Sequence, residues 1–290
     1  MLHKRQTDGS TTDREDSPLL SGENPTCKGC LVAMDQVSYS VTVKGHEKAL
    51  LRDISLVVRP GELLAIMGGS GAGKSTLMEL LSCRKRAGII YGRILYNGYK
   101  VGPADSWRCA LVARDDHHVA TMSVEEILTF TARLRMPRAS LAAVSMRVAE
   151  VLRMLLLEDV KTTRVGNAII RGISGGQRKR LSIGVGLLAM PEIVLLDEPT
   201  TGLDSRSARV VMASVQRICT RPNAVTIAAT IHTPSPEILK MFAKLVIVRA
   251  GRIMYYGPAS EVASALAAKP YDLVFSADRK NAADVALGAM

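Results

Sequence analysis

The sequence predicts an α/β fold, because strand-length apolar runs alternate with segments of helical periodicity. The runs at Leu63–Met67, Ile193–Leu196 and 224–231 are short and continuously apolar, as in strands of a parallel sheet covered on both faces. Apolar residues spaced by three and four predict helices at 123–134 and 141–157. A chain of 290 residues is long enough to bury a full core as one large domain or two lobes.

The chain before this core has a different composition. The first 30 residues are rich in Ser, Thr, Asp and Gly and poor in apolar side chains, which predicts a disordered N-terminal tail, residues 1–30. Alternating apolar residues over 31–43 and 52–58 then predict antiparallel strands, and Asn97-Gly98 predicts a hairpin turn. A small antiparallel sheet is therefore expected beside the parallel one.

Charge and composition narrow the classes of function without choosing among them. The chain has 38 Lys and Arg against 27 Asp and Glu, and its net charge of +11 suits nucleic acid, an anionic membrane or a nucleotide polyphosphate. Aromatic residues make up only 4%, so platforms that stack single-stranded nucleic acid are not indicated. No apolar run approaches the roughly 18 residues that cross a bilayer, and the polar N-terminus carries no secretory signal. These observations predict a soluble or peripheral protein in the cytosol.

A glycine-rich loop lies between the apolar run Leu63–Met67 and the next predicted helix. It fits G-x-x-x-x-G-K-[ST], and its residues are Gly68, Gly69, Ser70, Gly71, Ala72, Gly73, Lys74, Ser75 and Thr76. Glycine lets the backbone turn with positive φ and approach phosphates closely, while the N–H groups and the helix N-terminus face the anion. Lys74 is expected to reach the β- and γ-phosphates of a nucleotide, and the Ser75 hydroxyl to ligate Mg²⁺.

Two carboxylates, Asp197 and Glu198, directly follow the apolar run Ile193–Leu196. The end of a buried strand near a phosphate loop is the usual place for a Mg²⁺-holding aspartate, so Asp197 is predicted to hold the metal directly or through water. Glu198 lies one residue further on and is predicted to polarise an attacking water. Together with the glycine-rich loop, these carboxylates indicate hydrolysis of a nucleoside triphosphate.

A second anion site is predicted where a helix begins near residue 175. A serine and two glycines at a helix start present backbone amides to an anion, and the four residues of this site are Ser174, Gly175, Gly176 and Gln177. Because the chain already has one phosphate loop, this second site is expected to cover a nucleotide held by another copy.

Five motifs occur in one order along the chain, at 68–76, 174–177, 195–199, 201–204 and His232. In that order they resemble the nucleotide-binding domain of an ABC transporter, and the resemblance covers roughly residues 31–265. The closer resemblance is to subfamily G, the White and pleiotropic-drug-resistance half-transporters. It is carried by the segments 170–184, 197–205, 230–232 and 251–259.

The resemblance implies a P-loop NTPase fold with a RecA-like core, an antiparallel β lobe and an α-helical lobe specific to ABC proteins. The ATP-binding domain would then cover residues 31–265, with its helical lobe at about 115–175. Residues 266–290 would be a C-terminal extension, or the start of a linker to a membrane domain that this sequence lacks.

The resemblance also implies a head-to-tail dimer that hydrolyses ATP with Mg²⁺. ATP would lie between residues 68–76 of one domain and 174–177 of the other, with Asp204 at the seam. His232 would contact the γ-phosphate and hold the attacking water, so the catalytic residues would be Glu198, His232 and Lys74. The partner domain could be identical or different.

Such a domain would act at the cytosolic face of a plasma or endosomal membrane, or in solution if the chain is complete. It would energise a transmembrane domain in the same or another chain. The transport reaction implied by the resemblance is export of lipids or hydrophobic compounds, which is typical of eukaryotic subfamily G.

One position departs from the family pattern. Arg114 stands where ABC proteins have a glutamine, which can ligate Mg²⁺ through its carbonyl oxygen. Arginine has no acceptor and repels the metal, so Arg114 could instead pair with a phosphate, with Asp115 or with Asp116. This departure favours one alternative, a degenerate module that binds nucleotide and regulates a partner. A second alternative, permitted by the basic charge, is a soluble ABC ATPase that acts on ribosomes or nucleic acid.

Overall fold

The central sheet of the protein is mainly parallel. The structure is a computed structural model, and it describes residues 29–221 and 225–267. The strands of this sheet are β3 (Leu63–Met67), β6 (Cys109–Val112), β7 (Ile193–Leu196), β8 (Thr226–Thr230), β9 (Lys244–Arg249) and β10 (Arg252–Pro258). Their order is β10-β9-β3-β8-β7-β6, with only β10 antiparallel to its neighbour. The predicted α/β class is confirmed, and each predicted apolar run contains a strand.

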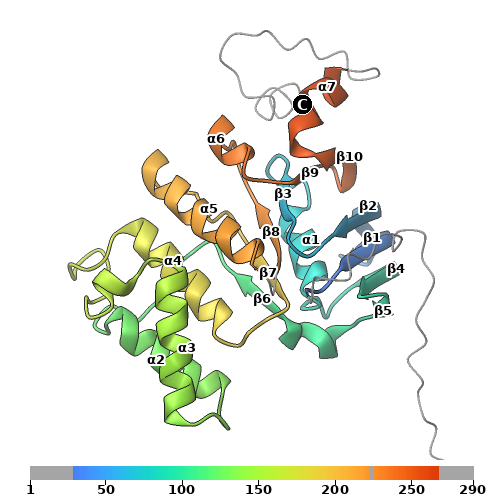
Figure 1. Cartoon of the computed structure of the whole chain (residues 1–290). Helices are drawn as coiled ribbons and strands as arrows, with labels where there is room; N and C mark the ends of the chain where they lie inside the picture. The colour runs from blue at the N-terminus through green and yellow to red at the C-terminus, as the bar shows by residue number, and fades with distance from the viewer. Residues whose placement is uncertain (1–28, 222–224, 268–290) are drawn as a thin grey trace, which may run out of the picture.

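A second, antiparallel sheet lies beside the first (Figure 1). Its strands are β1 (Val32–Val43), β2 (His46–Val58), β4 (Ile89–Tyr96) and β5 (Tyr99–Lys100), in the order β2-β1-β4-β5. Asn97 and Gly98 both have positive φ and join β4 to β5, which is the hairpin predicted from this dipeptide. The strand expected at 52–58 begins earlier, at His46, because Lys44 and Gly45 form another tight turn with positive φ.

The helices divide between the two sides of the parallel sheet. Helix α1 (Lys74–Leu81) packs with the antiparallel sheet, whereas α2 (Val124–Arg135), α3 (Leu141–Met154) and α4 (Gly175–Leu187) form a group at the opposite end of the molecule (Figure 1). Helix α5 (Ser205–Cys219) lies between this group and the short helix α6 (Pro236–Leu239), and α7 (Val262–Ala267) follows β10. Both α2 and α3 lie within the range 115–175 that was predicted for a helical lobe.

Helix α2 begins where its sequence requires. The Ser123 hydroxyl accepts a hydrogen bond from the Glu126 amide at 3.2 Å, and the Glu126 carboxylate accepts one from the Ser123 amide at 2.7 Å. This reciprocal capping box satisfies two backbone donors that have no partner within a helix.

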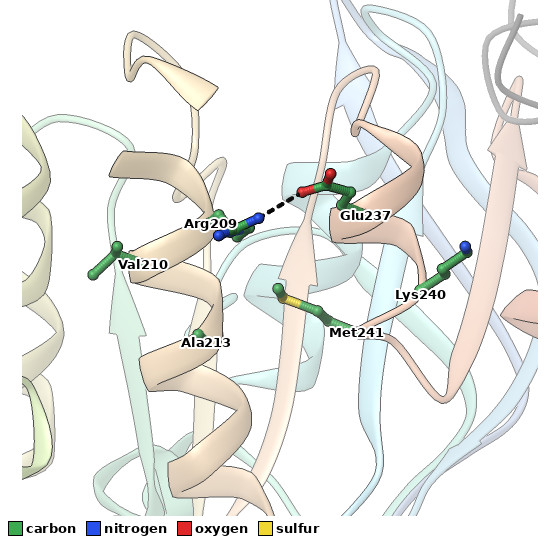
Figure 2. Close-up of a pocket in the computed structure, with 6 residues that line it drawn as sticks. All are labelled: Arg209, Val210, Ala213, Glu237, Lys240 and Met241. Carbon is green, nitrogen blue, oxygen red and sulfur yellow. Dashed lines mark hydrogen bonds and ion pairs between the residues drawn. The ribbon is translucent and has the colours of Figure 1, made fainter. Parts of the chain in front are cut away.

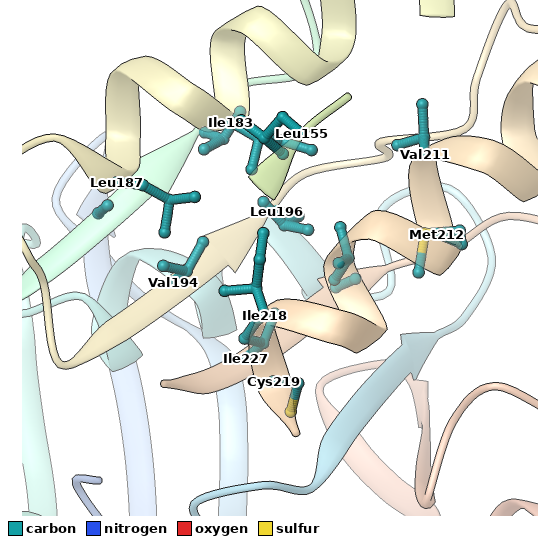
Figure 3. Close-up of a cluster of buried hydrophobic side chains, with 14 of the residues drawn as sticks. Leu155, Ile183, Leu187, Val194, Leu196, Val211, Met212, Ile218, Cys219 and Ile227 are labelled. Atoms are coloured by element: carbon teal, nitrogen blue, oxygen red, sulfur yellow. The ribbon is translucent and has the colours of Figure 1, made fainter. Parts of the chain in front are cut away.

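The core explains why the central strands are apolar on both faces. Alternate residues of β7 enter two different clusters: Val194 and Leu196 pack with helices α2 to α5, and Ile193 and Leu195 pack with α1 and the antiparallel sheet. Figure 3 shows the first cluster, where Leu187 of α4 and Ile218 of α5 meet the sheet. A strand buried on both sides loses the polar–apolar alternation of an exposed sheet.

Two predictions fall largely outside the described residues. These are the N-terminal tail, of which residues 1–28 are not described, and the C-terminal extension, of which 268–290 are not described. Across the described ranges, no helix is both long and apolar enough to span a membrane. The thiols Cys30, Cys83, Cys109 and Cys219 are buried and free.

Candidate functional site

The glycine-rich loop connects the end of β3 to the start of α1. Gly73 is the N-cap of α1 and has φ 109°, in the region that favours glycine. At Gly68 a Cβ atom would lie 2.3 Å from the Val248 carbonyl oxygen of β9, so no side chain fits there. The local sequence therefore forces a tight turn whose backbone passes close to the neighbouring strand and ends at a helix N-terminus.

The Lys74 side chain folds back over this loop. Its ammonium group donates hydrogen bonds to the carbonyl oxygens of Gly68 at 2.8 Å and Gly69 at 3.0 Å. The positive charge is thus held above the turn, where the backbone N–H groups at the start of α1 also carry partial positive charge. Ser75 follows in the first helical turn, and both side chains line an open cavity of about 770 Å³.

The two predicted carboxylates enter the same region from β7. The Asp197 amide donates to the Val112 carbonyl oxygen of β6 at 2.9 Å, which extends the parallel pairing by one step. Glu198 then has φ 45°, so the chain turns sharply after the strand. Its carboxylate accepts a hydrogen bond from the Thr201 hydroxyl at 3.0 Å. Glu198 lines the cavity together with Lys74.

Thr230, at the end of β8, holds both acidic residues. Its hydroxyl donates to Asp197 Oδ1 at 2.6 Å and accepts from the Glu198 amide at 2.8 Å. Sequence reasoning missed this role, because a threonine in an apolar strand carries no signal alone. The available signal was its position: residues at the carboxyl ends of adjacent parallel strands meet at one edge of the sheet.

His232 follows β8 and is exposed on the wall of the cavity. The next residue, Thr233, has φ 37°, so the backbone turns there as it does after β7. The structure therefore brings Lys74, Ser75, Glu198 and His232 to one cavity, at the carboxyl edge of the parallel sheet.

Arg114, the residue that departs from the family pattern, faces Glu198. Its guanidinium nitrogen lies 3.3 Å from the Glu198 carboxylate, and both residues line the cavity. The expected alternative of a pair with Asp116 is wrong, because Asp116 is engaged by Lys179 of α4 at 2.8 Å. No ion pair of Asp115 occurs within the described part of the chain. The ion-pair partner of Arg114 in this structure is thus the carboxylate predicted to polarise water.

Asp116 belongs to a polar network that the sequence did not reveal. Besides Lys179, it accepts a hydrogen bond from the Ser182 hydroxyl at 2.7 Å, and His118 contacts the same hydroxyl at 2.7 Å. Burial lowers the pKa of His118 below its ordinary value. Lys179 is only 3% exposed and also donates to the Arg114 carbonyl oxygen at 2.6 Å. The network fastens the segment that carries Arg114 to helix α4.

The predicted second anion site is the N-terminus of α4. The Ser174 hydroxyl accepts from the Gln177 amide at 3.3 Å, and the Gln177 side chain accepts from the Ser174 amide at 2.8 Å. Gly176 packs against Ser207 of α5, where a Cβ would lie 3.0 Å from its side chain. These four residues do not line the cavity. The structure therefore separates this helix start from the glycine-rich loop of the same chain.

Asp204 also lies outside the cavity lining, although Leu203 and Ser205 belong to it. Its carboxylate accepts a hydrogen bond from the Ser207 amide at 2.9 Å and caps α5. Hydrogen bonds from Ser207 hold the pKa of Asp204 below its ordinary value. The charge is therefore fixed at the exposed N-terminus of α5, close to Gly176.

The donor atoms of Ser75 and Asp197 suit Mg²⁺. Ser75 lines the cavity and offers a hydroxyl. Asp197 does not line the cavity, but it directly precedes Glu198, which does, and it offers the carboxylate oxygen that Thr230 does not occupy. Mg²⁺ prefers such oxygen ligands and completes its shell with water and substrate phosphates rather than a protein cage. The described residues contain no cluster of three or more acidic, histidine or cysteine side chains that could enclose a metal.

A separate groove lies between α5 and α6 (Figure 2). Val210, Ala213 and Met241 give it an apolar floor, and Arg209 pairs with Glu237 at 3.1 Å across it. None of the predicted site residues lines this groove.

Comparisons with known proteins agree with this geometry. A profile of the ABC transporter family matches residues 51–201. ABC transporter G family member 22 of Dictyostelium discoideum is 38% identical over 232 residues, which are 78% of this chain and 38% of that protein. The broad substrate specificity ATP-binding cassette transporter ABCG2 of Rattus norvegicus is 36% identical over 260 residues, 86% of this chain and 39% of that protein. The chain thus spans less than two fifths of the length of these relatives.

A solved structure shares the fold. The dimeric post-hydrolysis structure of the ATP-binding cassette MJ0796, bound to ADP and Pi, aligns with a TM-score of 0.62. The alignment covers 79% of this chain and 98% of that one, at 20% sequence identity.

Proposed function

Because the chain belongs to the ABC transporter family, as an ATPase domain similar to G-family members, we propose that it hydrolyses ATP to energise transport across a membrane. One observation carries this proposal: Lys74, Glu198 and His232 line one cavity, although they lie far apart in the sequence. The carboxyl edge of a parallel sheet is where α/β proteins bind ligands. The residues converging there have the chemistry that phosphoryl transfer to water requires.

Hydrolysis would proceed by in-line attack of water on the γ-phosphate, without a covalent intermediate. The loop N–H groups at 68–76 and the Lys74 ammonium would bind the phosphates and neutralise charge. Glu198 would accept a hydrogen bond from the attacking water, since the Thr201 hydroxyl and the Thr230-bound backbone hold its carboxylate in place. His232 would contact the γ-phosphate from the exposed side. Mg²⁺ held by Ser75 and Asp197 would supply further charge neutralisation at the phosphates.

The proposed active unit is a head-to-tail dimer. The exposed residues Ser174 and Gly175 at the start of α4 do not line the cavity at the chain's own phosphate loop, so this helix N-terminus is suited to a phosphate bound by a partner. Asp204, capping α5 beside them, would lie at the seam between the two domains. The solved cassette with the same fold is described as dimeric.

The proposed partner is a transmembrane domain, in the same or another chain, that contacts the helical lobe. The similarity to G-family transporters supports this partner and a location of the domain at the cytosolic face of a membrane. We further propose export of lipids or other hydrophobic compounds as the transport reaction. The rat relative is named for broad substrate specificity.

The test is Mg²⁺-dependent ATP hydrolysis by the purified chain, measured over a range of protein concentrations. Turnover per chain is expected to rise steeply with concentration, because each site needs a second copy, and to vanish in Lys74→Ala. Turnover that does not depend on concentration would contradict the dimer, and turnover that survives in Lys74→Ala would contradict the assigned site.

A second candidate function is a regulatory module that binds ATP without rapid turnover. The contact of Arg114 with Glu198 favours it, because the guanidinium neutralises the carboxylate that should polarise water. Tight ATP binding with no hydrolysis at any protein concentration would support this alternative.

A further inference from the structure

In the ion pair between Arg114 and Glu198, the arginine side chain is exposed and the glutamate is held in place by hydrogen bonds. The Glu198 side chain is only 14% exposed, whereas that of Arg114 is 56% exposed. Glu198 is held from two directions, by the Thr201 hydroxyl and by the backbone bond to Thr230. An arginine with an exposed side chain changes rotamer rapidly, so the partner that can leave this pair is Arg114.

The backbone beneath Arg114 is fixed. The buried ammonium of Lys179 donates to the Arg114 carbonyl oxygen at 2.6 Å and lies 3.4 Å from that of Ala113. The same ammonium pairs with Asp116 at 2.8 Å. The guanidinium can therefore swing about a stationary Cα without rearranging the loop.

Among the described residues that line the cavity, Glu198 is the only carboxylate, and Lys74 is a further cation. A nucleoside triphosphate entering the cavity would bring several phosphate oxygens. A guanidinium binds phosphate with two parallel hydrogen bonds, whereas its contact with Glu198 is an ion pair at 3.3 Å. Bound triphosphate would thus compete well for Arg114.

We propose that Arg114 exchanges between two anions, the Glu198 carboxylate before nucleotide binds and the terminal phosphate of a bound nucleoside triphosphate. This inference rests on the proposed function. The exchange frees Glu198 to accept a hydrogen bond from water only when a terminal phosphate is present. A diphosphate leaves the pair intact, so the site distinguishes ATP from ADP.

The exchange is tested by binding of ATP and ADP to the full chain in EDTA, which removes Mg²⁺ from the comparison. Arg114→Gln is expected to weaken ATP binding about three- to tenfold and to change ADP binding less than twofold, as expected for one charge-assisted contact. The matched control is Arg209→Gln: Arg209 is 61% exposed and also pairs with a glutamate, but it lies on the groove between α5 and α6 (Figure 2). The Arg209→Gln substitution should change the affinity for neither ATP nor ADP.

A double-mutant cycle separates exchange from simple charge effects. Glu198→Gln alone should raise ATP affinity about two- to fivefold, because Arg114 no longer has to leave a partner. That gain should disappear when Arg114→Gln is added. If the gain persists in the double variant, or if Arg114→Gln weakens ATP and ADP equally or not at all, the exchange is wrong. Thermal melting of each variant confirms that it is folded.

The outcomes distinguish this inference from the proposed function. If the unaltered chain binds both nucleotides and Arg114→Gln behaves like the unaltered chain, only the exchange fails. If the unaltered chain binds neither nucleotide, both proposals fail together.

Discussion

The Thr230 hydroxyl donates a 2.6 Å hydrogen bond to the Asp197 carboxylate. Thr230 is fully buried at the end of β8, and Asp197 directly follows the adjacent parallel strand β7. The same hydroxyl oxygen accepts from the Glu198 amide, so one side chain sets the orientation of a predicted metal ligand and of the sharp turn that follows it. The orientation of Asp197 and the turn at Glu198 thus both depend on the Thr230 hydroxyl, although Thr230 does not line the cavity.

Thr230→Val should therefore lower ATP turnover more than it lowers stability. Valine keeps the shape but leaves the Glu198 amide without its acceptor, which costs about 1–3 kcal/mol when the group is buried. Loss of alignment at Asp197 should reduce kcat by about tenfold or more. Steady-state hydrolysis and urea unfolding measure the two effects.

Thr226→Val is the matched control for that variant. Thr226 is also buried on β8, and its hydroxyl donates to the Cys30 carbonyl oxygen, away from the cavity. The Thr226→Val variant should lose about as much stability as Thr230→Val but keep its ATP turnover per folded chain. Equal losses of turnover in both variants would mean that Thr230 acts only through folding.

Gly68→Ala should weaken nucleotide binding strongly, whereas Gly69→Ala should retain it. A Cβ at Gly68 would lie 2.3 Å from a β9 carbonyl oxygen, so the loop must move away from its observed path. At Gly69 an added Cβ meets nothing within 4 Å. Isothermal titration with ATP should show at least a tenfold weaker Kd for Gly68→Ala. Similar affinities in the two variants would contradict the requirement for close backbone approach.

The sequence predicted those parts of the site that are local. The glycine-rich loop, with Lys74 after it, needs only a strand, a turn and a helix start, and all three can be identified from neighbouring residues. The contact of Arg114 with Glu198 was not predictable, because it exists only since β6 and β7 are neighbours in the parallel sheet. The burial of Lys179 was likewise not predictable, because it lies between arginines near the start of α4 and lysine is usually solvated.

Stability should fall as pH rises above 9. Burial raises the pKa of Cys30, Cys109 and Cys219 to about 12 from an ordinary value of 9.0. The native state keeps these protons, while the unfolded chain loses them above pH 9, so the native state binds more protons and loses relative stability. Each thiol contributes a slope of about 1.4 kcal/mol per pH unit between the two pKa values.

Cys109→Ala checks that slope directly. Urea unfolding between pH 9 and 11 should show a shallower decline of the free energy of unfolding for the variant than for the unaltered chain. The same slope in both proteins would show that the Cys109 thiol does not contribute.

Lys179→Met should destabilise the fold strongly, although the residue touches no nucleotide. Removing the buried ammonium leaves the Asp116 carboxylate, 14% exposed, with the Ser182 hydroxyl but without its counter-ion. Breaking a buried pair from one side costs about 3–5 kcal/mol, and replacing both partners with apolar residues restores much of it. Lys179→Met should thus lower the urea midpoint, and Asp116→Leu added to it should raise the midpoint again.

Lys85→Met is the control for Lys179→Met, because the ion pair of Lys85 with Glu79 is partly exposed and should be worth less than about 1 kcal/mol. Equal midpoints for Lys179→Met and Lys85→Met would show that the network around Asp116 does not anchor the Arg114 segment to α4.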